Sequence, residues 1–241
     1  MSRIFITGDT HGDIDFHKLN SKNFPQGREL TKEDYVIVCG DFGICWDGSA
    51  QDKYLREWYE NKPWTTLFVD GNHENFFLLN QYPEEDFFGG KVHRISPSII
   101  HLKRGEIFTL NGKTFFVMGG ASSIDKLYRQ TGISWWEEEI PSYQEFLNGQ
   151  KNLDLYNNKV DIILTHTAPT IIHQQTVKSD FGEDSVNHYL QMIFDSVEFD
   201  NWFIGHYHCD KNFLRNGNKI FPWDEGMPAI QILYDQIIEL K

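Results

Sequence analysis

Apolar residues gather in short runs along the chain, and each run stops abruptly at polar residues. Runs of this length that are apolar almost throughout and rich in β-branched residues are typical of strands buried on both faces of a sheet. Six runs have this form: RIFITGD (3–9), DYVIVCGD (34–41), TTLFVDGN (65–72), KTFFVMGG (113–120), VDIILTHT (160–167) and NWFIGHYH (201–208). Nearer the C-terminus, KNFLRN (211–216) and the partly alternating AIQILYDQIIEL (229–240) also have the pattern of strands.

Helical periodicity lies between several of these strands. Ser49 can cap a segment whose apolar residues form a stripe, and Ser142 and Glu145 have the spacing of a capping box. The predicted helices cover 50–61, 143–153 and 185–197. Because strands and helices alternate, the pattern predicts an α/β fold. The chain has no internal repeat and no Pro/Ser-rich linker, so we expect residues 1–241 to form a single domain.

Composition and charge narrow the class of protein. Hydrophobic residues make up 40% of the 241 residues, which is ample material for a core. The formal net charge is -13, and this argues against a dedicated nucleic-acid binder, because Lys and Arg supply most of the affinity for phosphate backbones. No segment approaches the roughly 20 apolar residues that span a bilayer. Small phosphate esters and peptides remain open as ligands.

The N-terminus and the cysteines bear on the compartment. The sequence MSRIFITGD enters a strand pattern at once and lacks the apolar region of a signal peptide. Cys39, Cys45 and Cys209 form neither a CxxC motif nor an even set. We therefore expect reduced thiols and a cytoplasmic location.

Five of the six predicted strands end in residues that can bind a metal ion. These residues are Asp9, His11, Asp41, Asn72, His166, His206 and His208. When helices connect parallel strands, the carboxyl ends of the strands lie along one edge of the sheet, where ligands usually bind. The sixth strand ends in Gly119-Gly120, which lets the backbone approach that edge closely.

Each of these residues also has a simpler explanation when it is taken alone. Asp beside Gly at a strand end is common turn chemistry, and a lone histidine such as His166 is often a hydrogen-bonded core residue. His206 and His208 are two residues apart, so their side chains lie on the same face of an extended segment. Because every strand would have to end in a ligand by accident, the set as a whole predicts a metal site.

The blocks GDTHG (8–12), GD (40–41), GNHE (71–74), TH (165–166) and GHYH (205–208) resemble the five ordered blocks of the calcineurin-like metallophosphoesterases. The resemblance implies a four-layered α/β/β/α sandwich of two mixed sheets flanked by helices. It also implies two divalent transition-metal ions, manganese first, with iron, zinc, nickel and cobalt as alternatives.

The same resemblance implies a role for each matching residue. Two ligand sets share one residue: Asp9, His11 and His208 for the first ion, Asn72, His166 and His206 for the second, and Asp41 for both. Imidazole and carboxylate ligands suit these metals and are poor for calcium or magnesium alone. Two cations about 4 Å apart can share a hydroxide and hold a phosphoryl group for in-line attack. The resemblance makes His73 the general acid for the leaving group and brings Asn72 close to the substrate.

The second block departs from the pattern of phosphoprotein phosphatases. Those enzymes carry a block resembling GDxVDRG, in which an Asp pairs with the catalytic histidine and an Arg binds phosphate. Here the block is GDFGICWDG, with Gly43, Ile44 and Cys45 at those positions. A protein phosphatase is therefore disfavoured, and His73 lacks its usual partner, a place that Asp47 could take.

The segment 119–141 has two interpretations. It is either a surface loop whose tryptophans pack on the body of the protein, or a lid over the substrate. In the lid, Arg129 would contact a phosphate and Trp135 or Trp136 would stack on a base or sugar. In both cases we expect the acidic run 137–139 to face solvent.

The sequence thus favours a dinuclear metal-dependent phosphoesterase that uses a metal-bridging hydroxide, with a small-molecule or nucleotide phosphodiesterase as the preferred form. A phosphomonoesterase, including a protein phosphatase, and a nuclease are alternative enzymes. A non-catalytic scaffold on the same fold is a third class, but such a protein would be expected to have lost ligands.

Overall fold

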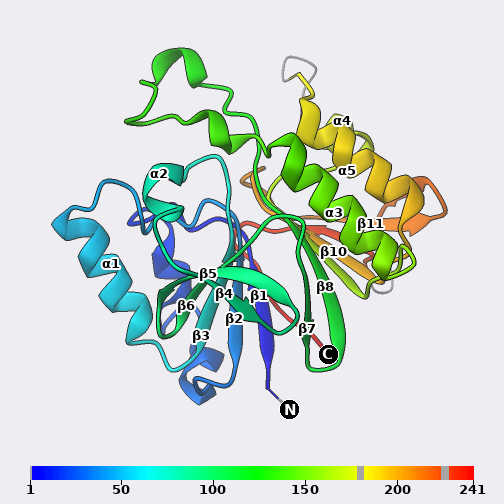
Figure 1. Ribbon diagram of the computed structural model, residues 1–241. Coiled ribbons are helices and arrows are strands. Elements are labelled where there is room, and N and C mark those ends of the chain that lie inside the picture. Colours follow the sequence, from blue (N-terminus) through cyan, green and yellow to red (C-terminus); the bar gives the residue numbers. More distant parts are fainter. Residues whose placement is uncertain (1, 178–181, 224–227) are drawn as a thin grey trace.

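The structure is a computed structural model that describes residues 2–177, 182–223 and 228–241. The described strands form two sheets of seven strands each (Figure 1). In spatial order, the first sheet consists of β14 (Ile237–Glu239), β1 (Ile4–Thr7), β2 (Tyr35–Cys39), β3 (Thr65–Val69), β6 (Ile99–Leu102), β5 (Gly90–Ser96) and β4 (Glu84–Phe87). The second sheet consists of β12 (Lys219–Pro222), β11 (Lys211–Asn216), β13 (Ile230–Ile232), β10 (Asn201–Ile204), β9 (Ile162–Thr165), β8 (Lys113–Met118) and β7 (Ile107–Leu110).

Both sheets are mixed. Strands β1, β2, β3 and β6 run parallel to one another, as do β8, β9, β10 and β13, and antiparallel strands complete each sheet. The α-helices are α1 (Ala50–Glu60), α2 (Phe76–Leu79), α3 (Tyr143–Leu155), α4 (Thr170–Thr176) and α5 (Ser185–Ser196). Because the central strands of each sheet are parallel, their carboxyl ends share one edge, and the loops that leave this edge carry the candidate site.

Successive residues of the central strands belong to different cores. Ile4 and Ile6 pack in the layer between the two sheets, whereas Phe5 packs on the outer face of the first sheet. Strand β2 alternates in the same way, with Ile37 between the sheets and Val38 outside. Both faces of these strands are therefore buried, which is why their sequences are apolar almost throughout.

Helices cover the outer faces of the two sheets (Figure 1). Leu55 and Tyr59 of α1 share a core with the first sheet, and Leu190 and Phe194 of α5 share a core with Trp202 of the second sheet. The expected four-layered α/β/β/α arrangement is confirmed. The three predicted helices are also confirmed, with Ser49 as the N-cap of α1 and a capping box at Ser142.

The C-terminal segment 229–240 differs from the prediction of one strand. It contains two strands, β13 and β14, which lie in different sheets. The polar residues between them carry the chain from the second sheet to the first, so that β14 pairs antiparallel with β1. Among the described residues, no helix combines the length and apolarity needed to cross a membrane. All three cysteines are free thiols.

Candidate metal centre

Loops at the carboxyl ends of β1, β2, β9 and β10 bring the predicted ligands together in two groups. The first group is Asp9, His11 and His208, and the second is Asp41, His166 and His206. Within each group, one ligand atom of every side chain lies within 4.8 Å of the others. Residues up to about 200 positions apart in the sequence therefore meet at one edge, as the strand pattern predicted.

The carboxylate of Asp41 faces both groups. Its Oδ2 lies 3.3 Å from His11 Nε2, and its Oδ1 lies 3.4 Å from His166 Nε2. Asn72 reaches the second group, since its Oδ1 lies 3.1 Å from His166 Nε2. This is the arrangement that a shared carboxylate between two cations requires, and the imidazole and carboxylate donors suit transition metals.

Four of these side chains sit on strained backbone. His11, Asp41, His206 and His208 have φ angles of 42°, 46°, 68° and 46°, in the left-handed region that non-glycine residues rarely adopt. Such a conformation costs on the order of 1–3 kcal/mol per residue and persists only where the surrounding structure enforces it. The sharp turn after each strand aims the side chain back across the edge of the sheets.

Two glycines make room for the ligands. A Cβ on Gly40 would lie 2.0 Å from His166 Nδ1, and a Cβ on Gly205 would lie 2.3 Å from Asp9 Oδ1. Any larger residue at either position would displace the ligand that it faces. The Gly-Asp and Gly-His pairs at the strand ends therefore have a packing reason in addition to turn chemistry.

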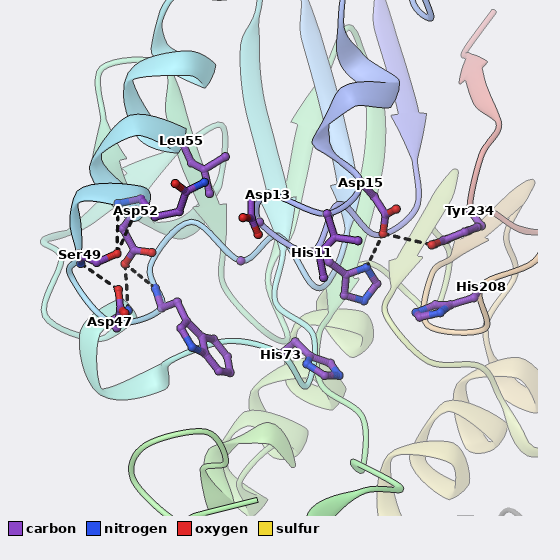
Figure 2. A pocket seen from close by; sticks show the side chains of 15 residues that line it. His11, Asp13, Asp15, Asp47, Ser49, Asp52, Leu55, His73, His208 and Tyr234 are labelled. Atoms are coloured by element: carbon purple, nitrogen blue, oxygen red, sulfur yellow. Dashed lines mark hydrogen bonds and ion pairs between the residues drawn. The ribbon is translucent and has the colours of Figure 1, made fainter.

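Hydrogen bonds orient two of the imidazoles. Nδ1 of His166 lies 2.9 Å from the carbonyl oxygen of Cys39, to which it can donate. Nδ1 of His11 lies 2.9 Å from Asp15 Oδ2, which also accepts from the hydroxyl of Tyr234 at 3.1 Å (Figure 2). In both histidines Nε2 therefore points toward the other side chains of its Asp/His group. Hydrogen bonds to the second ring nitrogen fix the tautomer of metal-binding histidines in the same way.

The charges of the site favour bound cations. Burial lowers the pKa of His166, but the Asp41 carboxylate outweighs this and raises it to about 10. Burial also lowers the pKa of His11, but the carboxylates of Asp41 and Asp9 outweigh it and raise this pKa to about 9. Burial raises the pKa of Asp41, yet the two imidazoles hold it well below its usual range. The buried carboxylates thus hold protons on the histidines, and metal ions would take the place of these protons.

His73 lies beside the centre and belongs to neither group. Its ring centre is 5.6 Å from that of His11, and its backbone nitrogen donates to Asp41 Oδ1 at 2.7 Å. The guanidinium of Arg129 contacts the ring, with Nη2 2.8 Å from Nε2 and 3.0 Å from Nδ1. Arg129 is held in turn by Asp125, whose Oδ1 lies 2.7 Å from Nε.

Asp47 is not the partner of His73. Its Oδ1 accepts from the backbone nitrogen of Ser49 at 2.9 Å, and Figure 2 shows it across the pocket from His73. The turn that begins α1 explains this, because Asp52 binds the backbone nitrogens of residues 46–48 and holds the segment away from the centre. The partner is therefore an arginine, not the carboxylate that the sequence suggested.

The segment 119–141 combines features of both interpretations. Trp136 is 6% exposed and packs in the core on the outer face of the first sheet, and Trp135 is 7% exposed with the Lys126 ammonium over its ring, while Arg129 reaches the centre. The expectation that the acidic run faces solvent holds for Glu137 and Glu138 and is wrong for Glu139, which is 1% exposed. Its carboxylate is buried because two donors of Ser123 satisfy it, the backbone nitrogen at 2.9 Å and the hydroxyl at 2.6 Å.

Ser123 links this segment to Asn72. The amide nitrogen of Asn72 donates to Ser123 Oγ at 3.1 Å, and the amide oxygen is therefore turned toward His166. The spacing of Asp15 four residues after His11 could have indicated its role. Nothing local in the sequence indicates Ser123, Glu139 or Tyr234.

Comparisons with known proteins agree with this geometry. Residues 2–210 match the model of the family described as calcineurin-like phosphoesterase. No curated protein matches the chain.

Two solved structures match the chain at low sequence identity. GAP50, the anchor in the inner membrane complex of Plasmodium, superposes with a TM-score of 0.50 at 14% identity, over 97% of this chain and 71% of that one. A protein of unknown function from Aquifex aeolicus has a TM-score of 0.32 at 17% identity, over 69% of this chain and 81% of that one. The family match over residues 2–210, together with the two Asp/His groups, shows that this chain belongs to the calcineurin-like phosphoesterase family.

Proposed function

We propose that this protein is a dinuclear metal-dependent phosphoesterase that hydrolyses a phosphodiester of a small molecule or nucleotide. The observation that carries the proposal is the Asp41 carboxylate, which lies within 3.4 Å of a histidine in each of two Asp/His groups. Two bound cations, manganese first, would activate water for attack and offset the charge of the phosphoryl group.

The chain itself would supply the remaining functions. Asp9, His11 and His208 would hold one ion, Asn72, His166 and His206 the other, and Asp41 both. His73, next to the centre but outside both groups, would donate a proton to the leaving oxygen. Burial lowers the pKa of His73, and the negative charge of a bound ester acts in the opposite direction to favour the protonated ring. Arg129, beside His73, would contact a phosphate oxygen.

The surroundings favour a diester over the alternatives. Among the described residues that line the large cavity beside His73, none is Lys or Arg, and a monoanionic diester needs fewer cations than a dianionic monoester. Ile44 and Cys45, which replace the histidine-pairing Asp and the phosphate-binding Arg of the protein phosphatase block, are 1% and 2% exposed and cannot reach a substrate. The net charge of -13 disfavours a nuclease.

A scaffold role, such as the anchor function named for the Plasmodium protein, would not require a ligand set. All seven predicted ligands are present here, and six of them form the two Asp/His groups. The complete set supports an enzyme.

The test is reconstitution of metal-free protein with Mn²⁺, followed by assays on matched phosphate mono- and diesters. We expect metal-dependent hydrolysis with the higher kcat/KM on diesters. An Asp41→Asn variant should lose activity on every substrate, because the charge shared by both ions is removed. Metal-loaded protein that hydrolyses neither class would contradict the proposal, and a preference for monoesters would replace the diester with the alternative.

A further inference from the structure

Two cavities adjoin the candidate metal centre. The larger, about 630 Å³, is formed mainly by loops of the first sheet and by α1, with His208 and Tyr234 from loops that follow strands of the second sheet, and it also includes His11 and His73 (Figure 2). The smaller, about 310 Å³, is formed by loops of the second sheet and by α4 and α5, and it includes His206. The cavities share no lining residue, so one reaches the first ligand group and the other reaches the second.

The larger cavity combines apolar walls with acidic groups. Its apolar and aromatic side chains are Ile14, Trp46, Leu55 and Tyr234. Of its carboxylates, Asp52 is bound to three backbone nitrogens and Asp15 to His11 and Tyr234. Asp13 and Asp47 are exposed, and none of the described lining residues is Lys or Arg. The imidazole of His11 is paired with the carboxylates of Asp15 and Asp41. A ligand group there meets aromatic surface and negative charge, which repels anions and attracts cations.

The smaller cavity is lined mostly by polar residues, with one carboxylate and one apolar side chain, Ile124. Ser122, Thr167 and Asn187 line it with hydroxyl and amide groups. Its carboxylate, Asp184, accepts from the backbone nitrogens of Ser122, Val186 and Asn187, because it caps α5. A small group that makes neutral hydrogen bonds fits this environment.

We propose that the substrate is an unsymmetrical phosphodiester whose leaving alcohol occupies the larger cavity and whose retained ester group occupies the smaller one. The assignment follows from His73, the candidate proton donor to the leaving oxygen, which lines the larger cavity. The leaving alcohol carries an aromatic or apolar group that is neutral or cationic, and the retained group is small and polar. The assignment of a leaving group rests on the proposed function, whereas the binding preference of each cavity does not depend on it.

Binding of leaving alcohols to metal-free protein tests the charge preference without catalysis. The probes are 4-(aminomethyl)phenol, 4-(hydroxymethyl)phenol and 4-hydroxyphenylacetate, titrated by ligand-observed NMR. We expect the ammonium compound to bind about tenfold more tightly than the carboxylate. This ratio corresponds to an exposed charge pair that favours the ammonium by about 0.7 kcal/mol and one that disfavours the carboxylate by about the same amount.

Matched variants locate the source of that preference. In the double variant Asp13→Asn/Asp47→Asn the ratio should fall to near one, whereas Asp154→Asn on α3, outside the cavity, should preserve it. Equal binding of the three probes, binding of none, or tighter binding of the carboxylate would overturn the charge preference.

A steric test assigns the two ester groups to the two cavities. Gln51 lines the larger cavity and Ile124 the smaller, and both side chains are exposed, so a tryptophan at either position can fill its cavity. Gln51→Trp should raise KM for 4-nitrophenyl methyl phosphate and 4-nitrophenyl phenyl phosphate alike, because both release nitrophenol. Ile124→Trp should affect the phenyl ester much more than the methyl ester.

The opposite pattern would place the leaving group in the smaller cavity and overturn the assignment. If the metal-loaded wild-type protein hydrolyses neither diester, the proposed function fails, while the NMR titrations still decide the charge preference of the larger cavity.

Discussion

Replacing Ser123 by alanine tests how the second ligand group is held. The hydroxyl of Ser123 accepts from the amide nitrogen of Asn72 at 3.1 Å and donates to Glu139 Oε2 at 2.6 Å. All three side chains are buried, with 6%, 5% and 1% exposure for Ser123, Asn72 and Glu139. Removing the hydroxyl leaves the Asn72 amide free to rotate its oxygen away from His166.

The size of the effect follows from these contacts. Loss of the partner of a buried donor or acceptor costs about 1–3 kcal/mol. Because Asn72 belongs only to the second group, we expect the affinity for one metal ion to fall about 10–100-fold, the range for residues that orient a ligand. The other ion, held by Asp9, His11 and His208, should bind as before.

Calorimetric titration of metal-free protein with Mn²⁺ resolves the two binding steps. Ser134→Ala is the matched control, because Ser134 lies on the same segment and its hydroxyl accepts from the backbone nitrogen of Gln130, away from Asn72 and Glu139. Ser123→Ala should weaken one step, and Ser134→Ala should weaken neither. Two unchanged steps in Ser123→Ala would show that Asn72 needs no such support, and two equally weakened steps would show a general disturbance of the segment.

Three further predictions concern protons and substrate. Without metal, the pKa values of His11 and His166 are raised to about 9 and 10, so both rings are protonated at pH 7. Metal binding should therefore release protons and become stronger as the pH rises toward 9. Calorimetry in buffers of different ionisation enthalpy measures the proton release, and its absence would contradict this prediction. His73→Asn should retain both ions and slow alkyl esters by about 10²–10⁴-fold while slowing nitrophenyl esters much less, since nitrophenolate leaves without a proton; loss of metal, or an equal defect on both esters, would make His73 a ligand or an orienting residue. Arg129→Ala should lower kcat/KM by about 10–100-fold with unchanged metal content, the loss of one charge-assisted contact, and unaltered kinetics would leave Arg129 without a substrate role.

The candidate ligands were accessible from the sequence because their positions follow from topology. Parallel strands end at one edge of their sheet, so the residues after β1 and β2 share one edge and those after β9 and β10 share another, whatever the length of the intervening chain. The packing of the two sheets brings these edges together. Buried strands also give the clearest pattern, since both faces are apolar. By contrast, β4 has the sequence EEDF, and its residues are exposed or partly exposed, so no apolar run in the sequence indicates this strand.

The supporting contacts were not accessible, because they depend on tertiary packing. Asp15 and Tyr234 are 219 residues apart and belong to no shared pattern. Glu139 lies in a run of three acidic residues, which is ordinarily solvent-exposed, and only the donors of Ser123 make its burial possible. The segment 229–240 shows the same limit. Its partly alternating apolar pattern does not reveal that the chain passes from the second sheet at β13 to the first sheet at β14.

The metal content of the protein after reconstitution with Mn²⁺ tests the central claim most directly. Elemental analysis at neutral pH, after removal of free metal, should give about two ions per chain, because two ligand groups share the Asp41 carboxylate. The same measurement on Asp41→Asn should give clearly fewer ions, since both groups lose a ligand charge. Wild-type protein that binds no transition metal, or an Asp41→Asn variant that binds as much as the wild type, would contradict a shared dinuclear centre.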